Sequence, residues 1–195
     1  LPVWPDAPSP ALDAVLSVGA SRSPTRLALE QLAPNLGLAL VVTIRPPPLL
    51  VLLGAGPEVA PLLRIARVLG WFAWVADHRT GLLEDPRIQS ADRLLAVRPG
   101  AVVAALANTG VDAAIVMTHT AEGDLAALAT LAAADVRYVG LLGPPARRDE
   151  LLARLTPAQR AALDGRLHAP VGLPLGGEGP EAIALAISAD MQRAQ

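Results

Sequence analysis

Apolar residues in this sequence form short continuous runs that alternate with helically spaced stretches. The runs are bounded mostly by proline, glycine or polar residues, and such runs are typical of strands buried on both faces of a sheet. They lie at residues 38–44, 49–53, 72–76, 94–97, 113–117 and 137–142. Between most of them, apolar residues recur every three or four positions, as on an amphipathic helix. These helices are predicted at residues 58–69, 101–108, 124–134, 146–155 and 180–193.

Strands that alternate with helices in this way predict βαβ units. We therefore expect an α/β fold over residues 37–195, a doubly wound, Rossmann-like domain with a mostly parallel sheet and helices on both faces. A further helix is predicted to start at Thr156-Pro157, an N-cap residue followed by proline. Residues 1–36 differ because prolines interrupt them repeatedly. We interpret them as an arm or remnant, in which residues 10–18 and 25–32 could each form a short helix.

Composition excludes several classes of function. Of 195 residues, 52% are hydrophobic and 17% charged, which excludes a mainly disordered chain. The chain has no cysteine, and all 16 of its basic residues are arginine. Disulfides, thiolate metal sites, a cysteine nucleophile, a P-loop lysine and a Schiff-base lysine are therefore excluded. A net charge of −2 and 3% aromatic residues do not support a nucleic-acid-binding face.

The sequence also predicts the cellular location of the protein. No stretch reaches the roughly 20 apolar residues of a membrane-spanning helix. The first residues do not follow the pattern of a signal peptide, because an aspartate and several prolines stand there. We therefore expect a cytoplasmic protein. Because few residues are charged, part of its apolar surface is expected to pack against another chain, either a second copy or a partner.

The most informative local motif is Gly54-Ala55-Gly56, which joins a predicted strand to a predicted helix. The first glycine permits a tight turn, and the second lets a phosphate approach the helix N-terminus. Asp77 ends the following strand, where an acid binds the ribose hydroxyls of NAD, while Arg79 could accommodate the 2′-phosphate of NADP. Two interpretations stay open: the motif binds a nucleotide or another phosphate ligand, or it is only a tight turn.

A second group of candidates follows the strand predicted at residues 113–117. Thr118 and His119 end that strand, at the edge of the sheet where ligands collect in this architecture. His119 is a candidate acid–base group with Asp124 orienting its imidazole. Alternatively, His119 is a structural turn residue and Asp124 an acid at a helix start. No metal site is predicted, because no two histidines have the spacing of a helical ligand pair.

Two further glycine clusters are candidates for pocket walls. Gly140 and Gly143 close a predicted strand just before Arg147 and Arg148, and Gly172 begins a glycine-rich segment before the last helix. Their backbone could line one pocket, with an arginine facing a phosphate. The alternative is that they form turns only.

Taken in order, these blocks resemble the C-terminal Rossmann domain of the xanthine dehydrogenase accessory factors (XdhC/CoxF type). The resemblance covers residues 38–193. It departs from the family pattern at Pro57, where a histidine is usual, and at Pro144, where a serine is usual. The family's N-terminal domain is expected to be missing from this sequence. The blocks that carry it are Gly54-Ala55-Gly56, Asp77-His78-Arg79, Ala91-Asp92-Arg93, Met117-Thr118-His119, Gly140-Leu141-Leu142-Gly143, His168 to Leu173 and Pro180 to Ala184.

The resemblance implies an accessory or chaperone protein for the maturation of a bacterial molybdenum hydroxylase. Such proteins bind the molybdenum cofactor, protect it while a cysteine desulfurase supplies sulfur, and help to insert it into the apoenzyme. The hydroxylase and the desulfurase are then the expected partners. The candidate binding residues are Gly54, Ala55, Gly56, Asp77, Arg79, Thr118, His119, Gly140, Gly143 and Gly172.

The alternative is an NAD(P)-dependent oxidoreductase of unknown substrate. For that chemistry, His119 and Asp124 are the one candidate acid–base pair, since lysine and cysteine are absent. Because this catalytic inventory is thin, we expect a cofactor-binding accessory protein rather than an enzyme. The ligand, molybdenum cofactor or NAD(P), stays open.

Overall fold

The computed structural model describes residues 25–28, 41–44, 46–106 and 109–194, and the chain divides into two compact units, residues 1–46 and 47–195. In the first unit, β1 (Thr25–Ala28) pairs antiparallel with β2 (Val41–Ile44). The helix expected over residues 25–32 is thus wrong at residues 25–28, because their backbone pairs with a β-branched run distant in sequence. The helix expected over residues 10–18 lies outside the described residues.

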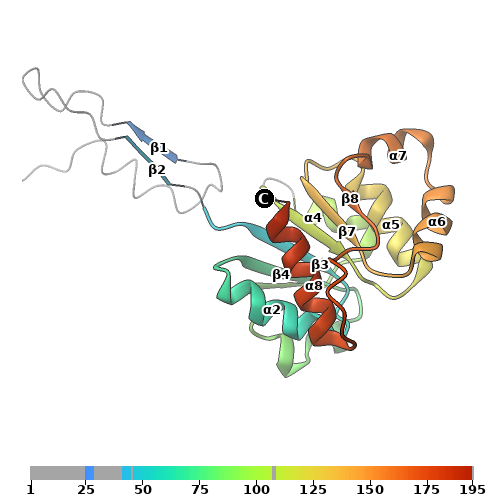
Figure 1. Cartoon of the computed structure of the whole chain (residues 1–195), viewed down its shortest axis with the longest axis horizontal. Helices are drawn as coiled ribbons and strands as arrows, with labels where there is room; N and C mark the ends of the chain where they lie inside the picture. Colours follow the sequence, from blue (N-terminus) through green and yellow to red (C-terminus); the bar gives the residue numbers. More distant parts are fainter. Residues whose placement is uncertain (1–24, 29–40, 45, 107–108, 195) are drawn as a thin grey trace, which may run out of the picture. The chain divides into compact units, whose positions relative to one another are not determined.

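The second unit is built on a six-stranded sheet in which every paired neighbour is parallel (Figure 1). The strand order is β5-β4-β3-β6-β7-β8. The chain therefore steps outward from β3 to β5, returns to the other side of β3, and steps outward again. This order confirms the doubly wound, Rossmann-like α/β fold. The strands are β3 (Leu49–Leu53), β4 (Phe72–Ala76), β5 (Arg93–Leu95), β6 (Ala113–Val116), β7 (Tyr138–Leu141) and β8 (Leu167–His168).

Helices cover both faces of this sheet. On one face, α2 (Val59–Val68) and α8 (Pro180–Arg193) pack side by side (Figure 1). The other face carries α4 (Val102–Ala105), α5 (Ala121–Leu131) and α6 (Pro145–Arg154). The described residues also form the α-helices α3 (Thr80–Leu83) and α7 (Pro157–Leu163).

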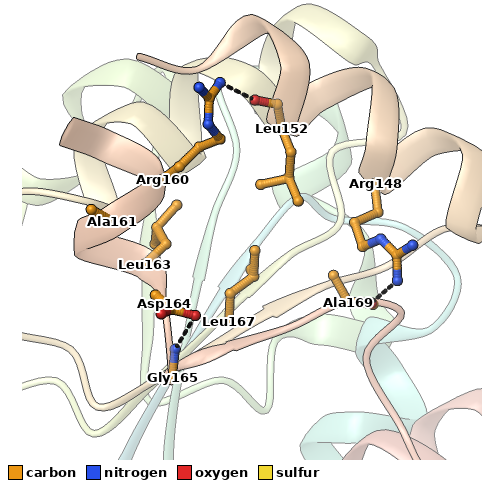
Figure 2. Close-up of a pocket in the computed structure, with 9 residues that line it drawn as sticks. All are labelled: Arg148, Leu152, Arg160, Ala161, Leu163, Asp164, Gly165, Leu167 and Ala169. Atoms are coloured by element: carbon orange, nitrogen blue, oxygen red, sulfur yellow. Dashed lines mark hydrogen bonds between the residues drawn. The ribbon is translucent and has the colours of Figure 1, made fainter. Parts of the chain in front are cut away.

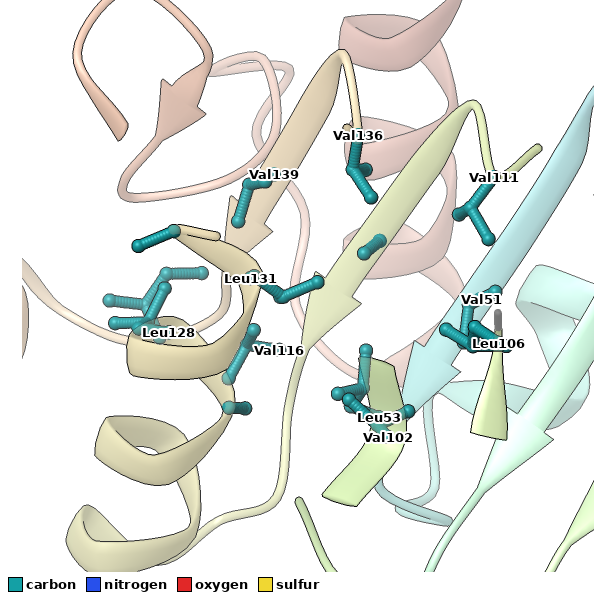
Figure 3. Packing of buried hydrophobic residues seen from close by; sticks show 14 of the residues in the cluster. Val51, Leu53, Val102, Leu106, Val111, Val116, Leu128, Leu131, Val136 and Val139 are labelled. Atoms are coloured by element: carbon teal, nitrogen blue, oxygen red, sulfur yellow. The ribbon is translucent and has the colours of Figure 1, made fainter. Parts of the chain in front are cut away.

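Two apolar cores flank the central strand β3. Val51 and Leu53 pack with residues of α4, α5 and β6 in one core (Figure 3), whereas Leu50 and Leu52 pack with residues of α2 and α8 in the other. All five residues of β3 are buried. This double burial explains why the strand appears in the sequence as a continuous apolar run rather than as an alternating pattern.

The predicted boundaries hold best where burial defines them. The strands at residues 49–53 and 72–76 and the helix at residues 180–193 are confirmed at both ends. Helix α5 begins three residues before its predicted start, because the Thr120 hydroxyl caps it by accepting the Gly123 N–H. The predicted strand at residues 38–44 is confirmed at Val41–Ile44, but it belongs to the antiparallel pair.

Short elements account for what the sequence did not predict. Strand β8 is only two residues long, and α3 is a single turn. The helix predicted at residues 101–108 is a 3₁₀ turn (Pro99–Ala101) followed by the four-residue α4, and residues 107–108 lie outside the description. Across the described ranges, no helix has the length and apolar character needed to cross a membrane.

Candidate functional site

The candidate site lies at the carboxyl ends of β3 and β6. These strands are neighbours, but the helices that follow them, α2 and α5, cover opposite faces of the sheet. Ligands of doubly wound folds bind at this reversal, because the diverging connections leave a crevice there. We refer to it below as the switch-point crevice.

Residues with positive φ follow four neighbouring strands at this edge. Gly54 has a φ of 118°, His119 of 62°, Gly143 of 143° and Gly172 of 105°. Only His119 is not glycine, and the left-handed region is costly for a residue with a side chain. The sequence singled out all four residues, but only the structure shows that His119 adopts this conformation.

Gly54 lies where the chain passes between β4 and β6. Its N–H donates to the Ala76 carbonyl oxygen at 2.8 Å. A Cβ at this position would collide with the Met117 carbonyl group and would lie 2.9 Å from the Thr118 Cα. The turn therefore requires glycine because the backbone that follows β6 occupies the space of a side chain.

The Asp77 carboxylate is fully engaged at the end of β4. It accepts the Ala55 N–H at 2.9 Å, the Arg79 N–H at 2.9 Å, Arg79 Nε at 3.0 Å and Arg79 Nη2 at 2.7 Å. Burial raises the pKa of Asp77, but the hydrogen bonds from Arg79 and Ala55 and the guanidinium charge outweigh it, and the pKa is about 2. Asp77 thus ties the glycine turn to Arg79. A ribose or a 2′-phosphate would have to displace this ion pair.

Glu58 and His119 meet beside the glycine turn. Glu58 directly precedes α2, its side chain is 9% exposed, and its Oε2 has no hydrogen-bond partner among the described residues. His119 Nε2 lies 3.4 Å from this oxygen. A Cβ on Gly56 would collide with the imidazole and lie 2.9 Å from Glu58 Oε2, so glycine lets both side chains approach the turn. The acid that faces His119 is therefore Glu58.

Glu58 was not predicted from the sequence, although a signal was present. An acid at the N-cap position after a glycine turn is unexpected where the motif predicts phosphate binding, since its charge opposes an anion. The second interpretation of Asp124 is the one that the structure favours. Its buried carboxylate accepts the Thr118 N–H at 3.1 Å, the Thr118 hydroxyl at 2.7 Å and Arg147 Nη2 at 2.9 Å. Asp124 therefore anchors the β6 turn to α6 rather than orienting the imidazole.

The other predicted glycines differ in what surrounds them. A Cβ on Gly140 would meet the Val171 side chain at 2.6 Å, and one on Gly172 would meet the Ala186 backbone at 3.2 Å, so both sit in packed surroundings. Gly143 is different, because its nearest neighbour is the stem of Arg147 at 3.3 Å. Of these three predicted pocket glycines, Gly143 alone has the stem of a long polar side chain as its nearest neighbour.

A second polar cluster surrounds Asp190 in α8. Its carboxylate accepts the Tyr138 hydroxyl at 2.7 Å and Arg193 Nη2 at 2.9 Å, and His168 Nδ1 lies 3.3 Å away. The Tyr138 and His168 rings stack with their centroids 4.0 Å apart. Burial and the hydrogen bond to Asp190 raise the pKa of Tyr138. The cluster fastens α8 to β7 and β8, so His168 is explained as a structural residue.

A separate hollow lies between α6, α7 and β8 (Figure 2). Its volume is about 580 Å³, and its arginines already donate to carbonyl oxygens, Arg148 to Ala169 at 3.1 Å and Arg160 to Leu152 at 3.0 Å. Arg148 is one of the two arginines predicted to face a phosphate, and it lines this hollow; the predicted glycines, Asp77, Arg79, Thr118 and His119 do not. In the part of the chain that the structure describes, no group of three or more histidine or acidic side chains could hold a metal ion.

Comparison with known proteins gives the family. The family model described as the XdhC Rossmann domain matches residues 50–191. The chain is 30% identical over 188 residues to a protein of Bacillus subtilis (strain 168) that is named as a probable xanthine dehydrogenase subunit, and the match covers 96% of this chain and 52% of that protein. A crystal structure described as a xanthine dehydrogenase from Bacillus halodurans superposes with a TM-score of 0.67 and 29% identity, over 84% of this chain and 49% of that one.

The chain thus spans about half the length of the relatives that it matches. The match to the family model extends from β3 into the last turn of α8 and includes the whole switch-point crevice. The resemblance seen in the ordered sequence blocks is thereby confirmed, and the chain belongs to the XdhC Rossmann domain family.

Proposed function

We propose that this chain is an accessory protein of a molybdenum hydroxylase of the xanthine dehydrogenase type, and that it binds the molybdenum cofactor at the switch-point crevice. Family membership and the names of the relatives support the accessory role. One observation carries the binding: the buried Glu58 oxygen without a hydrogen-bond partner among the described residues. A buried polar atom without a partner costs free energy, so it marks a place where a ligand group completes the structure.

The residues of the crevice fit a polar ligand that brings a hydrogen-bond donor to Glu58. Glu58 offers a hydrogen-bond acceptor, and the Gly54–Gly56 turn keeps the strand end free of side-chain bulk. A ligand phosphate directed toward α6 would lie near Arg147, whose guanidinium is paired with Asp124. When bound, the cofactor supplies the redox-active molybdenum that the client enzyme uses. This chain's own residues bind and shield it.

The proposal makes two partners necessary. This chain has no cysteine, so it offers no thiol on which sulfur could travel. Sulfur for the cofactor would come from a separate cysteine desulfurase, and the cofactor would pass to a separate hydroxylase. The open carboxyl edge of the sheet is the surface at which both transfers would take place, because the cofactor would lie there.

NAD(P) is the second candidate ligand, and the strand order favours it, since dinucleotide-binding folds share this order. The side chains fit a dinucleotide poorly. Asp77 is held by Arg79 and Ala55, Pro57 has no N–H for a phosphate, and Glu58 places negative charge at the helix N-terminus. We therefore place NAD(P) second.

The test is retention of freshly released molybdenum cofactor by the purified chain, with the retained pterin measured by fluorescence after oxidation. We expect about one cofactor per chain. Gly56→Ala should weaken retention at least tenfold, because its methyl group would lie 2.9 Å from Glu58 Oε2 and crowd the carboxylate that receives the ligand. Gly81→Ala is the matched control, since a Cβ there meets nothing within 4 Å. No retention above that of a heat-denatured sample would refute the proposal, and tight NAD(H) binding in its place would establish the second candidate.

A further inference from the structure

The glycine turn is a poor phosphate site because few of its donors are free. The Ala55 N–H donates to Asp77, the Val59 N–H donates to the Gly56 carbonyl oxygen at 3.2 Å, and Pro57 has no N–H. Phosphate sites at helix N-termini depend on such N–H groups and on positive potential. The charge balance of the turn therefore differs from the one that its glycine pattern predicts.

Glu58 places a carboxylate where a phosphate site would need positive potential. Its side chain is 91% buried (9% exposed), and its Oε2 is aimed between Gly56 and the His119 ring, without a hydrogen-bond partner among the described residues. A buried carboxylate oxygen of this kind is stabilised by an N–H donor, and a charge-assisted hydrogen bond to it is strong. The group that completes this site is therefore a donor rather than an anion.

His119 covers the carboxylate from the crevice. Its side chain is 44% exposed, and its Nε2 lies 3.4 Å from Glu58 Oε2. The backbone is left-handed at this residue, a conformation that is found in ligand clamps and switch regions when it occurs outside glycine. Because nearly half of the ring is in solvent, it can turn away without opening either apolar core.

We propose that Glu58 recognises the N–H edge of a 2-amino-4-oxopyrimidine ring and that His119 is a movable cover over it. This edge is shared by pterins and guanine, and it presents an amino group beside a ring N–H, so both neighbours of the carboxylate are donors. Adenine presents its amino group beside ring acceptors, which a carboxylate repels. The inference rests on the proposed function and fixes the orientation of the ligand. The pyrimidine ring of the ligand lies at the start of α2, and the phosphate of the ligand points away from that helix.

The test compares ligands that differ only at this edge. Pterin and lumazine differ in having an amino or an oxo group at position 2, and GMP and AMP share their sugar and phosphate. By calorimetry on the full chain, we expect pterin to bind at least tenfold more tightly than lumazine. Glu58→Gln should reduce this preference to less than threefold, while Glu84→Gln, a change at an exposed acid, should preserve it. A matching preference for GMP over AMP would extend the site to guanine nucleotides, and its absence would restrict it to pterins.

Equal binding of pterin and lumazine, or a preference that survives Glu58→Gln in a variant with a native circular dichroism spectrum, would overturn the inference. If the cofactor is retained but the preference is absent, the proposed function stands and this inference fails. If the cofactor is not retained, the proposed function itself fails. His119→Gly tests the cover separately: we expect unchanged or tighter pterin binding, and a loss of affinity would show that the imidazole contacts the ligand.

Discussion

The turn at Gly54 requires a residue without a side chain, and Gly54→Ala tests this requirement. The variant adds one methyl group at a φ of 118°, where the Met117 carbonyl group already fills the space. The Met117 carbonyl group and the Thr118 Cα cannot yield easily, because both are backbone atoms of the segment that follows β6 in the sheet centre. Relief requires β3 and β6 to separate at the point where their following helices diverge.

The magnitude follows from two separate costs. A side chain forced into a left-handed conformation costs about 1–2 kcal/mol. Overpacking by one methyl group in a close-packed region adds about 1–3 kcal/mol. Gly54→Ala should therefore lower the free energy of unfolding by about 2–5 kcal/mol, a large part of the stability of an ordinary domain.

Two other glycines separate these costs. Gly70 has a φ of 71° but open space around its Cβ position, so Gly70→Ala isolates the dihedral cost of about 1–2 kcal/mol. Gly81 has open space and no positive φ, so Gly81→Ala should change stability by less than about 0.5 kcal/mol. Urea denaturation of the three variants, followed by circular dichroism, gives the comparison. If Gly54→Ala costs no more than Gly70→Ala, the argument from the close approach of β3 and β6 is refuted.

Three smaller changes test the polar contacts. Although burial raises it, the hydrogen bonds from Arg79 hold the pKa of Asp77 at about 2, below its ordinary value of 3.8. The ionised Asp77 carboxylate therefore contributes its full stabilisation above about pH 4, and this contribution is lost as the pH falls toward 2. In acid denaturation, Asp77→Asn should lack about 1–2 kcal/mol of this pH-dependent contribution to the free energy of unfolding. Identical pH profiles for the variant and the original protein would contradict it. Tyr138→Phe leaves the buried Asp190 carboxylate short of a donor and should cost about 1–3 kcal/mol in urea denaturation, whereas a loss below about 0.5 kcal/mol would count against that hydrogen bond. Thr156→Ala removes the capping box of α7 and should cost about 1 kcal/mol by the same assay, with an unchanged midpoint as the contrary result.

Burial on both faces made the central fold predictable from sequence. Continuous apolar runs gave the bounds of β3 and β4, and a proline at the first helical position marked the start of α8. These signals are local, since each run must remove its side chains from water wherever it lies in the chain. Elements that depend on a distant partner were missed. Strand β1 exists because β2 pairs with it, and the two residues of β8 exist because β7 does.

The sequence also pointed to the candidate site but not to its side-chain contacts. Strand ends and glycines pointed to Gly54, Gly56 and His119, because turns at the carboxyl edge require such residues. Asp124 stood nearer to His119 in the sequence, yet Glu58 is the acid that faces the imidazole. Glu58 follows β3 and His119 follows β6, so the two side chains meet only because these strands are neighbours in the sheet. Spacing along the chain determines burial and turns, whereas charge pairing depends on distances of a few ångströms between segments that only the tertiary fold brings into contact.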